Sequence, residues 1–97
     1  MIGTVWEGEC WTEKDTYPER YSLYFYEKTY LLRINGASLI SDSLHIDDEE
    51  LSGKYIYDSP DIILIKDIGN LSGIMKDKNI YLLNENGEEI MLARKKN

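Results

Sequence analysis

Hydrophobic and polar residues alternate with a period of two along most of the chain. Tyr21, Leu23 and Phe25 share one face of residues 21–26, and residues 30–35 repeat the pattern. This period, combined with aromatic and branched side chains, is typical of half-buried β-strands. The two segments are separated by a short polar connection of the length that a tight hairpin needs. The pattern therefore predicts a β-hairpin over residues 21–35.

The second half of the chain shows the same pattern, with clearer turn signals between the strands. It predicts strands at residues 51–57, 62–66, 71–75, 80–83 and 89–94. Pro60 lies in a polar segment, which predicts a turn because proline lacks a backbone donor. Asn86 and Gly87 form the strongest hairpin signal in the chain, since a type I′ turn needs positive φ at both central residues.

A three-residue sequence repeat occurs in two of these strands. Leu-Ser-Gly occurs at residues 51–53 and again at residues 71–73, each time followed by a turn and an aliphatic strand. Glycine inside a strand often marks a bend or a place where another backbone or ring packs closely. The repeat therefore predicts two successive hairpins of one meander, with Gly53 and Gly73 at such positions.

The remaining segments complete an all-β prediction. Residues 2–11 alternate like a strand, residues 12–19 are a polar loop, residues 36–42 suit a turn or a single helical turn, and residues 43–46 suit a short strand. The total is eight or nine short strands with no amphipathic helix. Closing such a meander into a barrel removes exposed strand edges, and eight strands leave room for side chains or one small ligand. We therefore predict a small antiparallel up-and-down barrel of about eight strands.

Composition agrees with one folded domain over residues 1–97. Hydrophobic residues make up 42% of the chain and charged residues 30%, which fits a globular protein. No apolar run approaches the roughly 20 residues that span a bilayer. No signal peptide is visible, so we expect a cytoplasmic protein, or a secreted or lipoprotein domain from which a signal segment has been removed. The single Cys10 excludes an internal disulfide and a multi-cysteine zinc site.

The net charge of −7 belongs to the first half of the chain. Residues 1–50 hold 11 acidic and 4 basic side chains, whereas residues 51–97 hold 7 of each. The excess peaks at Asp47, Asp48, Glu49 and Glu50, which are expected to form a solvated acidic loop. A surface of this sign repels phosphate, which argues against nucleic acid and anionic lipid as partners. A basic protein partner remains compatible with it.

The two ends of the chain resemble a known family. Gly3-Thr4-Val5-Trp6 opens the first strand, and Arg94 lies in the last. Together with the Leu-Ser-Gly-Lys-Tyr stretch from residue 51, these features are similar to small bacterial lipocalin-like (calycin-type) barrel domains. The resemblance implies that Trp6 plugs one end of the barrel with Arg94 stacked on it, a cation–π contact worth about 1 kcal/mol.

Three arrangements that could carry chemistry have simpler explanations. Cys10 and His45 could form a nucleophile–base pair, but the adjacent carboxylate of Glu9 disfavours a thiolate. Asp42, His45 and the acidic run lack the glycine and ligand spacing of a calcium loop. The glutamates on the terminal strands, which could form a glycosidase pair, are expected on the solvent face; they are Glu7, Glu9, Glu88 and Glu89. We therefore predict no enzymatic activity, metal or cofactor.

Two functions remain at this stage, beside a purely structural role as a domain cut from a larger protein. The first is a binding module that holds a small apolar or amphipathic ligand inside the barrel. Its predicted lining is Tyr21, Leu23, Phe25, Tyr30, Leu32, Tyr55 and Tyr57. The alternative is a protein-interaction or inhibitory module, because exposed tyrosines are common at interfaces and an acidic segment can steer a basic partner. Its predicted surface is Tyr24, Tyr26, Asp47, Asp48, Glu49 and Glu50.

Overall fold

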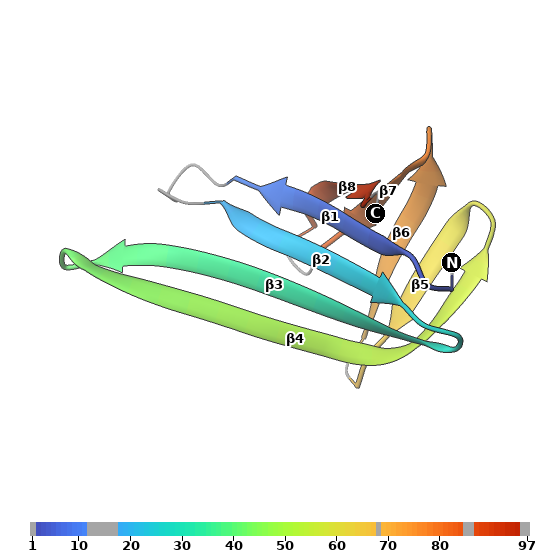
Figure 1. Ribbon diagram of the computed structural model, residues 1–97, viewed down its shortest axis with the longest axis horizontal. Coiled ribbons are helices and arrows are strands. Elements are labelled where there is room, and N and C mark those ends of the chain that lie inside the picture. The colour runs from blue at the N-terminus through green and yellow to red at the C-terminus, as the bar shows by residue number, and fades with distance from the viewer. Residues whose placement is uncertain (1, 12–17, 68, 85–86, 96–97) are drawn as a thin grey trace.

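Eight antiparallel strands follow one another around a closed barrel (Figure 1). The computed structural model describes residues 2–11, 18–67, 69–84 and 87–95. The strands are β1 (Val5–Cys10), β2 (Glu19–Phe25), β3 (Thr29–Ile40), β4 (Ser43–Asp58), β5 (Asp61–Ile65), β6 (Asn70–Lys76), β7 (Asn79–Leu83) and β8 (Glu89–Arg94). Each pairs with the next, and β8 closes on β1 by placing Trp6 opposite Arg94. The predicted all-β up-and-down barrel is confirmed.

The described residues contain no helix that could cross a membrane.

Alternate residues of the strands point inward and fill the barrel. The buried hydrophobic core consists of Trp6, Tyr21, Leu23, Phe25, Tyr30, Leu32, Ile62, Leu64, Leu71, Ile80, Leu82, Ile90 and Leu92. β5 is apolar on both faces, so its sequence alone allows either register. The structure buries Ile62 and Leu64 completely and leaves Ile63 and Ile65 half-buried on the outer face.

The two copies of Leu-Ser-Gly have different surroundings. A Cβ atom on Gly53 would overlap the backbone carbonyl oxygen of Ile65, because β4 and β5 approach each other closely there. A Cβ atom on Gly73 would meet its nearest neighbours at 3.4 Å, an ordinary contact distance. The predicted close approach of a second backbone is therefore confirmed at Gly53.

Strands β3 and β4 extend well beyond the rest of the barrel. Every residue of β3 pairs with β4, but β2 pairs with β3 only as far as Asn35. β5 pairs with β4 only from Tyr55 onward. Residues 36–40 and 43–47 therefore project as a two-stranded ribbon, which is the long hairpin at the left of Figure 1. We call this segment the ribbon, and the end of the barrel that carries it the mouth.

The ribbon corrects the predicted boundaries of this region. A turn or helical turn over residues 36–42 and a separate short strand over residues 43–46 are both wrong. The turn consists only of Ser41 and Asp42, whose φ values are 52° and 64°. Positive φ at two consecutive residues matches the twist of a two-residue hairpin, and aspartate tolerates this conformation better than most residues.

The acidic run is also part of a strand rather than a loop. Asp47 and Glu49 lie opposite Gly36 and Ile34 on the face that continues the barrel interior. Asp48 and Glu50 lie on the outer face of β4. Cross-strand partners stabilise this arrangement, since Arg33 Nε lies 3.0 Å from Glu50 Oε1.

The connection between β7 and β8 has the predicted length but not the predicted type of turn. Gly87 N donates to Asn84 O at 3.0 Å, and Asn84 N donates to Glu88 O at 2.9 Å. Gly87 has a φ of 79°, so the glycine follows the turn in a bulge-like position. The predicted hairpin exists, but its two-residue turn centred on Asn86 and Gly87 does not fit these bonds; Asn86 itself lies outside the described residues.

Candidate functional site

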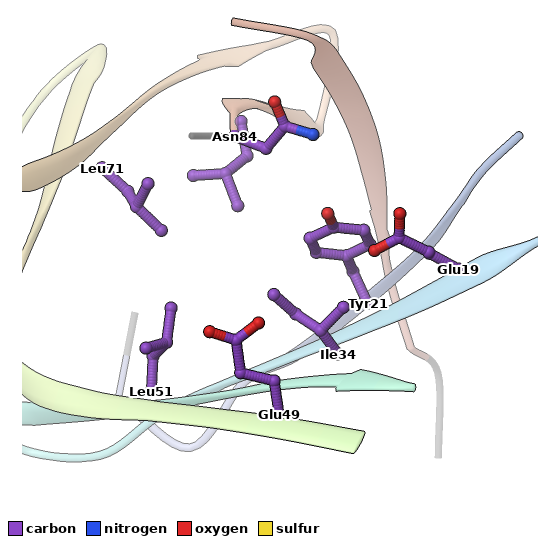
Figure 2. Close-up of a pocket in the computed structure, with 8 residues that line it drawn as sticks. Glu19, Tyr21, Ile34, Glu49, Leu51, Leu71 and Asn84 are labelled. Carbon is purple, nitrogen blue, oxygen red and sulfur yellow. The ribbon is translucent and has the colours of Figure 1, made fainter. Parts of the chain in front are cut away.

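A small cavity opens at the mouth of the barrel, at the base of the ribbon. Its volume is about 100 Å³. The residues that line it are Glu19, Tyr21, Ile34, Glu49, Leu51, Leu71, Leu82 and Asn84 (Figure 2). They come from β2, β3, β4, β6, β7 and the residue after β7, so strands distant in sequence converge on one site.

The floor of the cavity is apolar. Ile34 and Leu51 contribute from β3 and β4, and Leu71 and Leu82 from β6 and β7. In Figure 2, Leu51 and Leu71 point toward the same space from opposite sides. The cavity therefore begins where the packed core ends, and an apolar group that enters it is removed from water.

The rim of the cavity is polar and carries negative charge. The carboxylates of Glu19 and Glu49 border it, and Figure 2 shows the Glu49 side chain pointing into the opening. Among the described lining residues none is basic. A rim that carries only negative charge around a low-dielectric floor attracts positive ions, so the cavity favours a cation.

Asn84 and Tyr21 also border the opening, with Tyr21 beside Glu19 on β2 (Figure 2). Glu88 N donates to Asn84 Oδ1 at 2.9 Å, which fixes the orientation of the amide group. The Asn84 side chain also hydrogen-bonds to Tyr21. This pair offers an immobilised amide and a hydroxyl beside the two carboxylates, which suits recognition of a polar head group.

Burial raises the pKa of the Tyr21 phenol to about 12. The hydrogen bond from Asn84 opposes this shift, and the negative charge of Glu19 adds to it. The phenol therefore stays protonated in the folded state well above its ordinary pKa of 10.0.

The Tyr21 shift predicts a loss of stability at high pH. The pKa of a tyrosine phenol is about 10 in the unfolded chain, whereas the pKa of Tyr21 in the folded protein is about 12. Its contribution is thus fully present below pH 10 and is lost as the pH rises toward 12. Denaturant unfolding across this range should show a steeper decline for the wild type than for Tyr21→Phe. Equal declines in the free energy of unfolding of the two proteins would show that Tyr21 is not the source of the pH dependence.

Most residues predicted to line a ligand cavity instead fill the barrel. Leu23, Phe25, Tyr30 and Leu32 are fully buried among core side chains. Tyr30 Oη donates to Ile65 O at 3.0 Å.

The other predicted lining residues lie nearer the two ends of the barrel. Tyr55 packs edge-on against Phe25, with ring centroids 4.8 Å apart, and its hydroxyl donates to Tyr26 O at 3.0 Å. Tyr57 is 43% exposed at the end opposite the mouth. Of the predicted set, Tyr21 alone lines the mouth cavity.

Trp6 and Arg94 lie at the end of the barrel opposite the mouth. Trp6 is buried and its Nε1 donates to Thr4 Oγ1 at 2.9 Å. Arg94 is its cross-strand neighbour on β8, and both line a groove at this end. The proximity implied by the family resemblance is present, while stacking of Arg94 on the indole stays a prediction.

The predicted partner surface is divided between separate regions. Arg33 lies 5.9 Å from the Tyr24 ring centroid and also pairs with Glu50, so these three form a row across the outer face of β2, β3 and β4. Tyr26 is half-exposed beyond the end of β2, at the far end from the ribbon. Asp47 and Glu49 face the other side of the ribbon from Asp48 and Glu50.

The residues considered for catalysis occupy separate elements. Cys10 Sγ lies 3.5 Å from Glu88 Oε2, whereas His45 is exposed on the ribbon. Glu7, Glu9 and Glu89 are exposed, as predicted, and Glu88 is half-buried. Within the described parts of the chain, no three His, Cys, Asp or Glu side chains are grouped to hold a metal ion.

Most of the cavity residues were not predicted. Glu49 lies two positions before Leu51, on the same face of β4, so it occupies a position that would be in the core if the barrel continued. A charged residue at such a position marks the place where burial ends. That signal could have located the mouth, but it needs the strand over residues 43–58 to be recognised first.

No family model, no curated protein and no solved structure matches this chain. The likeness to lipocalin-like domains therefore stays a prediction.

Proposed function

We propose that the protein is a non-catalytic binding module whose mouth cavity takes a small amphipathic ligand with a cationic head. The observation that supports this is the combination of an apolar floor with a rim bearing two carboxylates in one cavity. The proposal keeps the predicted class of ligand and moves its site from the barrel interior to the mouth.

The size of the cavity limits the group that enters. At about 100 Å³ the cavity is smaller than the apolar cavity of about 150 Å³ that admits benzene in an engineered protein. A short alkyl group fits this space, whereas a fatty-acid chain does not. Pockets that enclose a whole drug-sized ligand are several times larger, so the cavity holds only one end of a larger molecule.

The rim selects the polar end of the ligand. A primary ammonium placed above the apolar floor would lie near the carboxylates of Glu19 and Glu49, with Tyr21 and Asn84 as further polar neighbours. An anionic head would meet the same carboxylates with like charge. We therefore expect n-butylamine to bind, n-butanol to bind more weakly and n-butyrate not to bind.

Calorimetric or spectroscopic titration with these three probes tests the proposal. n-Butylamine is a fragment, so binding in the millimolar range is expected. Glu49→Gln should weaken it about two- to fivefold, the effect of losing one exposed ion pair. Glu50→Gln is the matched control, because Glu50 is adjacent in sequence but faces outward and pairs with Arg33. Equal binding of amine and butyrate, or equal loss in both variants, would overturn the proposal.

A further inference from the structure

The end of the barrel opposite the mouth carries a second recess of different character. It is a groove of about 780 Å³, which we call the basal groove. Its lining is Thr4, Trp6, Tyr57, Met75, Lys78, Asn79, Ala93 and Arg94. The walls include an indole, a phenol and a thioether, and the two charged residues of the lining are both cations. An acidic segment with apolar side chains is the occupant that this chemistry favours.

The ribbon has the complementary chemistry. Leu44 is 55% exposed and Ile46 is 69% exposed, and both lie on its outer face. Asp48 lies next along β4 on the same face, Asp42 lies in the turn at the tip, and both are exposed. Two neighbouring apolar side chains flanked by carboxylates match an apolar groove with a cationic rim.

The position of the ribbon makes intermolecular contact feasible. It projects beyond the barrel along the longest dimension of the molecule, which measures 45 Å against 29 and 27 Å (Figure 1). In one molecule the ribbon and the basal groove are at opposite ends, so the ribbon cannot reach its own groove. A second copy of the chain can present its ribbon there.

We infer that the protein self-associates head to tail, with the ribbon of one copy seated in the basal groove of the next. Such a contact joins two different surfaces, so each copy keeps one free ribbon and one free groove and the assembly grows as a linear chain. Pairing two ribbons along β4 would instead bring Asp47 and Asp48 of both copies together, which like-charge repulsion disfavours. This inference is independent of the ligand proposed for the mouth.

The charge arrangement predicts how association responds to salt. Carboxylates on the ribbon meet Lys78 and Arg94, and added salt screens such exposed pairs. Sedimentation velocity should show oligomers that increase with protein concentration at low salt and decrease at high salt. Wild-type protein that stays monomeric at millimolar concentration in low salt would overturn the inference.

Two single variants and their mixture test the head-to-tail geometry. Ile46→Asp replaces an apolar side chain of the ribbon with a carboxylate, and Lys78→Glu reverses one charge of the groove. Each substitution should lower the association constant at least tenfold. Mixed in equal amounts, they should form heterodimers and nothing larger, because one intact ribbon meets one intact groove. Failure of the mixture to form heterodimers would contradict the geometry.

Matched substitutions outside the two surfaces serve as controls. Ile56→Asp introduces the same side chain at a half-exposed position of β4 outside the ribbon. Lys54→Glu reverses an exposed lysine that does not line the groove. Both variants should assemble like the wild type. Loss of assembly in either one would show that general charge or stability, and not the ribbon and groove, controls association.

Discussion

Replacing Gly53 by alanine is expected to lower the free energy of unfolding by about 3 kcal/mol. The added Cβ atom would overlap the carbonyl oxygen of Ile65, and a backbone oxygen held in a strand cannot move aside without shifting β5. This loss is a large part of the roughly 5–15 kcal/mol by which a domain is stable. Denaturant unfolding followed by tryptophan fluorescence measures it directly.

Gly73→Ala is the matched control for this substitution. Gly73 has the same two preceding residues as Gly53, but its Cβ position is 3.4 Å from the nearest atom. Alanine there also restricts the unfolded chain, so the free energy of unfolding should change by less than about 1 kcal/mol. Equal losses at both positions would show that β4 does not approach β5 as described.

Replacing Ile62 by alanine is expected to cost about 3 kcal/mol, the usual loss for truncating a fully buried aliphatic residue. Ile62 is 0% exposed, whereas Ile63 is half-buried on the outer face of β5. Ile63→Ala should therefore cost about 1 kcal/mol. A one-residue slip of β5 would exchange the two faces and reverse this order. Urea unfolding midpoints of the two variants distinguish the registers.

The alternation of apolar residues predicted most of the barrel. The inward faces of β2 and β3 follow directly from Tyr21, Leu23 and Phe25 and from Tyr30 and Leu32, all of which are buried. In these strands a period of two coincides with burial on one side, so the face could be assigned from the sequence. The closure of β8 on β1 followed from the need to cover strand edges.

The ribbon was not predicted because its sequence lacks the usual strand and turn signals. Acidic residues have low strand propensity, and the turn uses Ser41 and Asp42 rather than an asparagine–glycine pair. Its strand conformation depends on cross-strand pairing over the full length of β3, which composition does not reveal.

The site was predicted less well than the fold for a related reason. Periodicity shows which residues face inward but not whether they leave free space. In this barrel Leu23, Phe25 and Leu32 fill the interior, and space remains only where inward positions become polar, at Glu49 and Asn84. Locating that boundary requires the length and register of β4.

The central proposal is that the mouth cavity binds an alkyl group with a cationic head, and mapping amide chemical shifts during titration with n-butylamine tests it most directly. We predict shifts concentrated at the strand positions of Tyr21, Ile34, Glu49, Leu51, Leu71 and Leu82, with no change around Trp6 and Tyr57 at the opposite end. Shifts centred on the basal groove, or no shifts at saturating amine, would contradict the proposal.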